Sequence, residues 1–263
     1  MPELNPPQRQ KARPQLKVCG ITDAAFAVEA ARRGIGYLGF IFAENSPRRI
    51  YPSTAREISD FIRAVISFGR IPKLVGVFVS HSVEEIDKIA QLANLDVIQL
   101  HSRDYSADDV EALKSKGHEV WQLYGSREDG PCKCDHGETD SVNGMATAGN
   151  ETAATGKRDY SADEMLQGRG VADAVLLDGS DGKRSGGTGK KADWSLVPTL
   201  KRAGRRVVLA GGISSANIAD AMATGADVID INSSIETAPG TKCTALLDEL
   251  LEKASPFYCA DQV

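Results

Sequence analysis

Cys19 and Asp178 are the two residues whose types and positions best suit proton transfer. Cys19 ends an expected strand, residues 16–19, and Asp178 directly follows the apolar run at residues 175–177. A thiol with a lowered pKa acts as a nucleophile or a general base, and a carboxyl that ends an apolar strand costs free energy unless it is paired or functional. A buried apolar cysteine and a turn-forming aspartate are the alternative interpretations. We expect the two groups to form a base–acid pair.

Two further loops have the composition of an anion site. Gly211 and Gly212 follow one apolar run, and Ser233 and Ser234 follow the next. Bare backbone N–H groups in such loops bind phosphate, so we predict a phosphate ligand here. Gly187 lies in a glycine-rich loop, residues 182–190, that lacks the spacing of a nucleotide-binding P-loop. A flexible lid over the site is the better interpretation of that loop.

Arg48 and His101 are candidate ligand contacts. A guanidinium at Arg48 could hold a carboxylate through two hydrogen bonds, although a solvated basic turn is the alternative. His101 ends an apolar run and could line the same pocket. Cys132, Cys134 and His136 lie close together in sequence, but their spacing matches no standard zinc motif, so we predict no metal site.

These residues are positioned by a repeated pattern of short apolar runs and amphipathic segments. Eight strands are expected at residues 16–19, 37–42, 74–79, 96–100, 118–123, 174–177, 206–210 and 228–231. Helices are expected between and after them, including 23–33, 53–67 capped by Ser53 or Thr54, one opened by a Ser82–Glu85 capping box, 107–116, 195–201, 217–224 and 244–254. Eight strands alternating with helices predict a single-domain (β/α)8 TIM barrel over residues 16–263. An open doubly wound sheet is the alternative, but the first strand lacks its glycine-rich fingerprint.

Two segments fall outside the pattern. Residues 1–15 are rich in Pro, Gln and Arg and are expected to be a disordered tail. Residues 126–169 contain few large apolar side chains, so they are predicted to be a disordered insertion between the fifth and sixth strands. Within it, residues 161–167 are the best candidate for the fifth helix.

The composition excludes several classes of protein. The chain has 263 residues, 41% hydrophobic and 25% charged, with a net charge of −5 and basic residues that are spread along its length. A nucleic-acid-binding protein needs a clustered basic face, and a membrane span needs about 20 apolar residues in a row; we expect neither partner. Five widely spaced cysteines argue against a disulfide scaffold and suit a reducing compartment.

The motifs taken together resemble phosphoribosylanthranilate isomerase, an enzyme family of tryptophan biosynthesis. The resemblance covers nearly the whole chain outside the tail and the insertion, with the motifs in the family's order. It is carried by Lys17-Val18-Cys19-Gly20-Ile21-Thr22, Ser46-Pro47-Arg48, Val75 to Val79, Gln99-Leu100-His101, Leu176-Leu177-Asp178, Gly186 to Gly189 with Asp193-Trp194, Leu209 to Gly212, and Glu236-Thr237 with Pro239-Gly240.

The resemblance implies an Amadori rearrangement of N-(5-phosphoribosyl)anthranilate to 1-(2-carboxyphenylamino)-1-deoxyribulose 5-phosphate, without a cofactor. It makes Asp178 the general acid, Cys19 the general base and Arg48 the contact to the anthranilate carboxylate. The loops at Gly211-Gly212 and Ser233-Ser234 would hold the phosphate. We also expect a cytoplasmic monomer, plastidial if a transit peptide has been removed, alone or fused to other tryptophan enzymes.

Three positions depart from the family pattern. Ser102 and Ser234 stand where the family has glycine, and Cys243 stands where it has aspartate. Ser234 lacks the conformational freedom of glycine, which could weaken phosphate binding. A related phosphate-binding barrel, such as a pentose-phosphate epimerase or the indole-producing synthase subunit, and a catalytically silent scaffold that binds a partner through the acidic insertion are the alternative functions.

Overall fold

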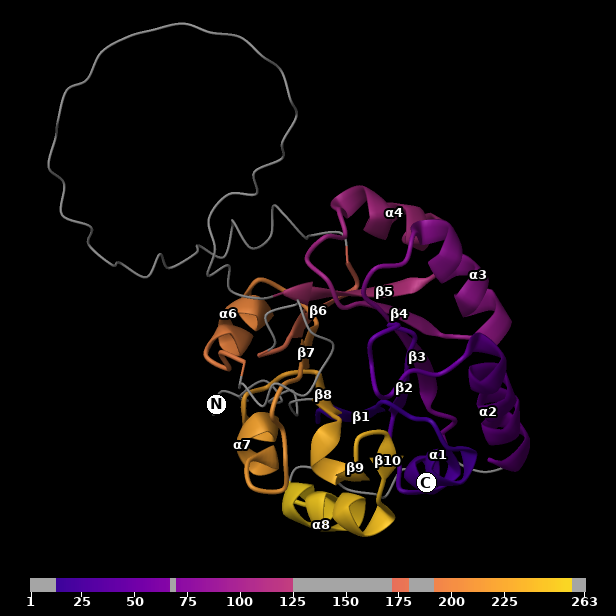
Figure 1. Ribbon diagram of the computed structural model, residues 1–263. Coiled ribbons are helices and arrows are strands. Elements are labelled where there is room, and N and C mark those ends of the chain that lie inside the picture. Colours follow the sequence, from indigo (N-terminus) through magenta and orange to yellow (C-terminus); the bar gives the residue numbers. More distant parts are fainter. Residues whose placement is uncertain (1–12, 67–69, 125–171, 180–191, 257–263) are drawn as a thin grey trace, which may run out of the picture.

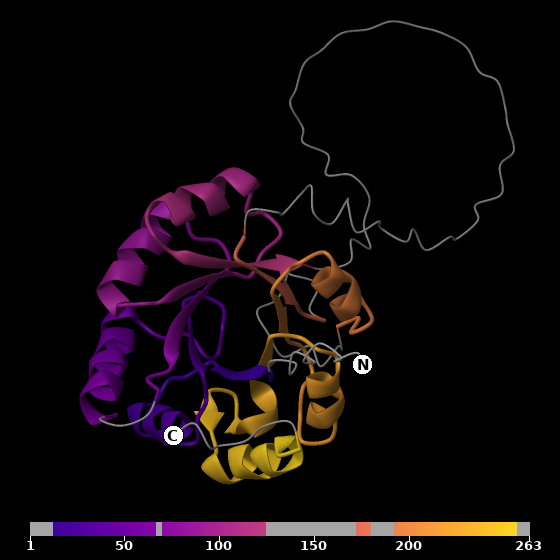
Figure 2. The ribbon, with the colours of Figure 1, turned by 180° about the vertical axis from the view of Figure 1, so that it is seen from behind.

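The computed structural model describes residues 13–66, 70–124, 172–179 and 192–256. Eight parallel strands close into a barrel in chain order, and helices surround it (Figures 1 and 2). The barrel strands are β1 (Gln15–Cys19), β2 (Tyr37–Ile41), β3 (Lys73–Phe78), β4 (Val97–Leu100), β5 (Glu119–Tyr124), β6 (Ala174–Leu177), β7 (Val207–Leu209) and β8 (Val228–Ile231). The helices are α1 (Ala24–Arg32), α2 (Pro52–Val65), α3 (Val83–Ala93), α4 (Ala107–Ser115), α6 (Leu196–Arg202), α7 (Ile218–Ala223) and α8 (Thr244–Ala254). The expected TIM barrel is confirmed.

Strand β1 shows how the barrel sorts its side chains. Successive residues of a strand point to opposite faces. Leu16 and Val18 belong to the large apolar cluster that includes helix residues, whereas Lys17 and Cys19 are also buried but lie on the other face, inside the barrel. This alternation sends two polar, reactive side chains into the interior.

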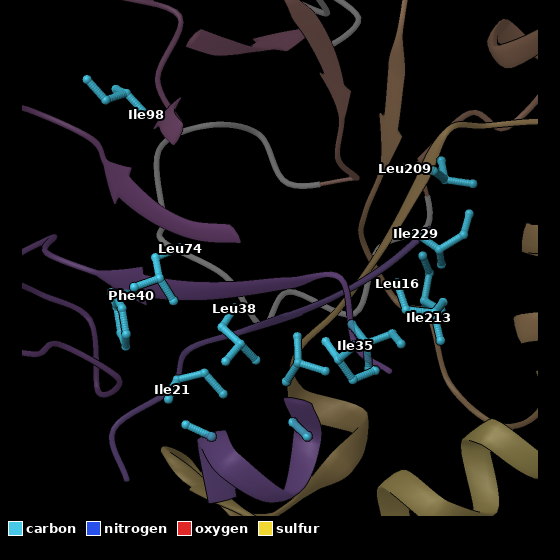
Figure 3. Packing of buried hydrophobic residues seen from close by; sticks show 14 of the residues in the cluster. Leu16, Ile21, Ile35, Leu38, Phe40, Leu74, Ile98, Leu209, Ile213 and Ile229 are labelled. Carbon is cyan, nitrogen blue, oxygen red and sulfur yellow. The ribbon is translucent and has the colours of Figure 1, made fainter. Parts of the chain in front are cut away.

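The hydrophobic core therefore has two layers. The outer layer packs strands against helices, and Figure 3 shows part of it around Leu16, Leu38, Leu74 and Ile229. The inner layer fills the barrel and consists of Tyr37, Val75, Val97, Trp121, Leu123, Ala174, Leu176, Val208, Ala210 and Val228. The interior is thus a packed core, and ligands must bind at its mouth.

The ends of the helices follow local chemistry. Ser82 forms the expected capping box with Glu85 at the start of α3. The expectation that Ser53 or Thr54 caps the second helix is wrong: α2 begins at Pro52, and Tyr51 is its N-cap. Proline has a fixed φ and no N–H, which suits the first helical position, so it starts the helix earlier than the serine.

Several expectations are corrected or lie beyond the described residues. Gln15 is not part of a disordered tail: it is the first residue of β1, its N–H donates to the Asp227 carbonyl, and it pairs with Val228 of β8. A 3-10 turn (Ser233–Ile235) and a hairpin of β9 (Glu236–Ala238) and β10 (Thr241–Lys242), none of them expected, follow β8. The predicted insertion at 126–169 and its helix at 161–167 lie outside the described residues, as does most of the tail. Among the described helices, none has the length and apolar character to cross a membrane.

Candidate active site

Cys19 and Asp178 lie at the same end of the barrel. Cys19 is the last residue of β1, and Asp178 directly follows β6. The thiol is buried against Ile41, Ala43 and Val77. Since β1 and β6 are parallel members of one closed barrel, both groups lie at its carboxyl-terminal mouth, where TIM-barrel chemistry takes place.

A buried lysine lies beside the thiol. Lys17 is completely inaccessible, and its Nζ donates to Asp230 Oδ2 at 2.7 Å. Lys17 also interacts with Cys19, two residues further along the same face of β1. Burial raises the pKa of the Cys19 thiol, and the Lys17 ammonium opposes this rise. Burial therefore makes the Cys19 thiolate a stronger base, and the nearby cation reduces the free-energy cost of forming that thiolate.

Asp178 is paired with a histidine. His101 Nε2 lies 3.1 Å from Asp178 Oδ2, and the side-chain amide nitrogen of Gln99 lies 3.1 Å from His101 Nδ1. These two contacts link Gln99, His101 and Asp178 into one chain of polar side chains. Gln99 and His101 thus set the orientation of Asp178 from the end of β4.

Arg48 is held in a buried ion-pair network. Its Nε and Nη2 donate to both carboxylate oxygens of Glu236, with Nη2–Oε2 at 2.7 Å. Lys242 Nζ donates to Glu236 Oε1 at 2.8 Å and to the backbone and side-chain oxygens of Asn232. Burial opposes ionisation of Glu236, but the hydrogen bonds from Arg48 and Lys242 outweigh it and lower the pKa of Glu236. These bonds fix the plane of the Arg48 guanidinium.

Gly20 lets this network approach the thiol. Its φ is +74°, and a Cβ at this position would lie 2.8 Å from Arg48 Cδ and 3.0 Å from Asn232 Oδ1. Any side chain would therefore be strained and would displace Arg48. The Cys-Gly pair at the end of the first strand has a structural reason as well as a chemical one.

The loop after β7 has the backbone of an anion site. Gly211 and Gly212 both have positive φ, at 87° and 65°. Asn217 holds the loop: its side-chain nitrogen donates to the Gly212 carbonyl at 2.9 Å, and its oxygen accepts from the Ser214 N–H at 2.9 Å. The loop shape is therefore fixed by a side chain that starts α7.

The serines that replace family glycines fit their positions. Ser233 and Ser234 lie in the 3-10 turn, and Ser234 does not have positive φ. The expected conformational penalty at Ser234 is thus absent. Ser102 is buried and exchanges hydrogen bonds with Asp104, its Oγ donating to Oδ2 at 2.9 Å.

Four of the residues singled out in the sequence lie outside the described residues. They are Gly187, Cys132, Cys134 and His136, and the rest of the glycine-rich loop at residues 182–190 lies outside them too. In the parts of the chain that are described, no group of three or more His, Cys, Asp or Glu side chains could hold a metal ion.

Sequence reasoning missed the second layer of the site. No roles were assigned to five polar residues whose side chains are all buried or nearly so: Lys17, Gln99, Asp230, Glu236 and Lys242. For Lys17, Gln99 and Asp230 the signal was a charged or polar residue within an otherwise apolar strand. That signal becomes informative only when the partner strand is known.

Comparison with known protein families gives one answer. The model of the N-(5'phosphoribosyl)anthranilate (PRA) isomerase family matches residues 16–158 and 136–253. The N-(5'-phosphoribosyl)anthranilate isomerase of Rhizobium etli (strain CIAT 652) is 32% identical over 244 residues, which cover 91% of this chain and 93% of that protein. The tryptophan biosynthesis protein TrpCF of Vibrio cholerae is 30% identical over 239 residues, covering 90% of this chain and 41% of the longer protein.

Solved structures agree with the fold. The phosphoribosyl anthranilate isomerase of Thermus thermophilus has a TM-score of 0.67 at 28% identity, covering 93% of this chain and all of that one. A structure of monomers generated from the dimeric enzyme of Thermotoga maritima has a TM-score of 0.65 at 24% identity, covering 92% and 98%. At that identity the second likeness concerns the fold alone.

Proposed function

The chain belongs to the N-(5'-phosphoribosyl)anthranilate isomerase family, and we propose that it catalyses the Amadori rearrangement of that substrate with Asp178 as acid and Cys19 as base. The product is 1-(2-carboxyphenylamino)-1-deoxyribulose 5-phosphate, formed in tryptophan biosynthesis. The observation that carries the assignment of roles is the placement of a buried thiol and a histidine-paired carboxyl at one barrel mouth.

Asp178 begins the reaction by protonating the furanose ring oxygen. The ring C–O bond breaks, and the nitrogen lone pair forms an iminium at C1. His101 Nε2, 3.1 Å from Oδ2, holds the carboxyl that supplies this proton. Fixing the carboxyl in one orientation favours proton transfer, because a general acid must lie within hydrogen-bond distance of the atom it protonates.

Cys19 completes the reaction as a base. The thiolate removes the C2 proton, the C2–H electron pair forms the C1–C2 double bond, and the iminium becomes an enolamine. Tautomerisation to the ketone follows without a change in overall oxidation state. Two proton transfers at different atoms need two groups in opposite protonation states, which a carboxylic acid and a thiolate supply.

Arg48 and the phosphate loops bind the two ends of the substrate. Glu236 engages Nε and Nη2 of Arg48, which leaves Nη1 for the anthranilate carboxylate. The backbone of Gly211 and Gly212, with the turn at Ser233 and Ser234, would receive the phosphate. His101 reaches the substrate through Asp178, and Gly187 is proposed as a further contact.

Two variants test the roles of Cys19 and Asp178. Loss of the fluorescent anthranilate substrate would be followed for the parent chain, Cys19→Ser and Asp178→Asn. We expect kcat to fall by roughly 10²–10⁴-fold in each. A Cys19→Ser variant within about threefold of the parent kcat would remove Cys19 from the mechanism, and a loss confined to KM would move Asp178 from catalysis to binding.

Complementation tests the activity itself. The full chain should restore growth of a tryptophan auxotroph that lacks this isomerase, and a catalytically silent scaffold would not.

We further propose a cytoplasmic monomer that can also exist as part of a fusion. The longer Vibrio cholerae protein supports the fusion, whereas the Thermotoga maritima relative is described as dimeric. Sedimentation at several concentrations measures the oligomeric state.

A further inference from the structure

Lys17 is a charged side chain that the reaction above does not use. It is wholly buried in the barrel, and the register of β1 and β8 places it directly opposite Asp230. Its ammonium lies 2.7 Å from Asp230 Oδ2. Replacing a buried ion pair by apolar groups is often neutral or stabilising. Stability alone is therefore a weak explanation for this lysine.

The geometry places Lys17 against the base. Cys19 lies two residues further on the same interior face, and Gly39 of β2 is its register partner. A Cβ at Gly39 would lie 2.8 Å from Cys19 Sγ and 3.2 Å from Lys17 Cε. The thiol and the lysine stem therefore pack against the same small patch of backbone, which only glycine leaves open.

The charges around Cys19 come from four elements. Lys17 lies on its own strand, Asp230 on β8, Lys242 on β10 and Arg48 in the loop after β2. Glu236 already binds both Arg48 and Lys242. Asp230 also interacts electrostatically with Asp178 and His101. Lys17 is thus the cation on the strand of Cys19 itself, and it contacts both Asp230 and the thiol.

We propose that Lys17, anchored by Asp230, is a positioning residue that stabilises the Cys19 thiolate and sets the pH at which this base acts. The inference rests on the proposed role of Cys19. A cation next to a thiol favours the thiolate, and the low polarity of the interior strengthens that attraction. Asp230 holds the Lys17 ammonium in place. Its own negative charge opposes ionisation of the thiol and so limits the effect of Lys17.

The pH profile of kcat/KM tests this role. Lys17→Met keeps length and volume but removes the charge. We expect its basic group to titrate at least about one pH unit higher, so that kcat/KM at pH 7 falls about tenfold or more and partly recovers at higher pH. Asp230→Asn keeps a hydrogen-bond acceptor but removes the anion, so its profile should move in the opposite direction.

A matched control separates the charge of Lys17 from a general loss of an ion pair. Lys201 pairs with Asp227 at 2.6 Å near the start of β8, at the opposite end of the barrel. Lys201→Met should leave the pH profile unchanged. The rate at which iodoacetamide alkylates Cys19, read from its peptide by mass spectrometry, should shift with pH in parallel with the kinetic profile.

The outcomes distinguish this inference from the proposed function. If Cys19→Ser is inactive but the profiles of Lys17→Met and Asp230→Asn match the parent, the role of Lys17 is wrong and the base stands. If Cys19→Ser remains active, the assigned base itself fails. If Lys17→Met does not fold, as judged by circular dichroism, Asp230→Asn decides. A pH profile of kcat/KM that is unchanged, or that shifts to higher pH, overturns the inference.

Discussion

His101 Nε2 lies 3.1 Å from Asp178 Oδ2, joining the ends of β4 and β6 across the strand between them. Gln99, two residues before the histidine, contacts the other ring nitrogen, with its side-chain nitrogen 3.1 Å from Nδ1. The proposed acid is therefore held by a relay of side chains from a neighbouring strand. This arrangement gives His101 a role that can be separated from direct substrate binding.

His101→Ala should lower kcat by about 10–100-fold with little change in KM, because Asp178 loses the donor that orients it. His101→Gln can still present an N–H and should recover part of that loss. Steady-state kinetics of both variants gives the answer. A rise in KM with kcat unchanged would mean that His101 contacts the substrate directly.

Arg48→Ala should lower kcat/KM by a factor equivalent to about 2–4 kcal/mol of transition-state stabilisation, because a charge-assisted contact to the anthranilate carboxylate of the substrate is lost. Glu236→Gln should have a smaller effect of the same kind, since it loosens the guanidinium without removing it. Arg49→Ala is the matched control, because Arg49 lies next in the chain and is partly exposed, 3.8 Å from Glu44. An effect at Arg49 but none at Arg48 would reassign the carboxylate contact.

Asn217→Ala should raise KM roughly 5- to 30-fold, equivalent to about 1–2 kcal/mol, with kcat little changed. The variant removes both hydrogen bonds that hold the loop around Gly212, so the proposed phosphate site loses its fixed shape. Inhibition by inorganic phosphate gives a second measurement, and its Ki should rise in proportion. A kcat loss at constant KM would contradict a binding role for this loop.

Cys243→Asp should stabilise the protein by about 0.5–2 kcal/mol. Cys243 is the N-cap of α8, and its side chain makes no capping hydrogen bond. Aspartate can accept from the free N–H groups of the first turn and complements the helix dipole. Thermal unfolding measures the change, with Cys243→Ala as the control that removes the thiol without adding a cap. Equal Tm values for the two variants would rule out the capping explanation.

Replacing residues 128–157 by a short Gly-Ser linker should leave folding and kcat nearly unchanged. Strands β5 and β6 pair in register from Trp121–Ala174 to Tyr124–Leu177, so the barrel itself fixes both ends of the connection. The free energy of closing a loop changes slowly with its length. A shortened chain that fails to fold would show that the segment packs as part of the domain.

The sequence by itself determined the elements and their order. Side-chain periodicity is a local property, and it placed β6, β8 and α8 at their observed bounds. Eight strands alternating with helices favour a closed barrel, and the first strand lacks the fingerprint of an open doubly wound sheet, so the fold and the mouth that carries Cys19 and Asp178 could be predicted as well. Exceptions arose where backbone chemistry outweighed the pattern, as at Pro52.

Only the tertiary structure decided which polar groups meet. Lys17 and Asp230 are 213 positions apart, and Arg48 and Glu236 are 188 apart. Each pair exists because barrel closure and the hairpin after β8 bring distant segments together. No periodicity encodes such a contact, since it depends on strand register and on which face each residue occupies. The candidate acid and base could be read from the chain, whereas the groups that tune them required the fold.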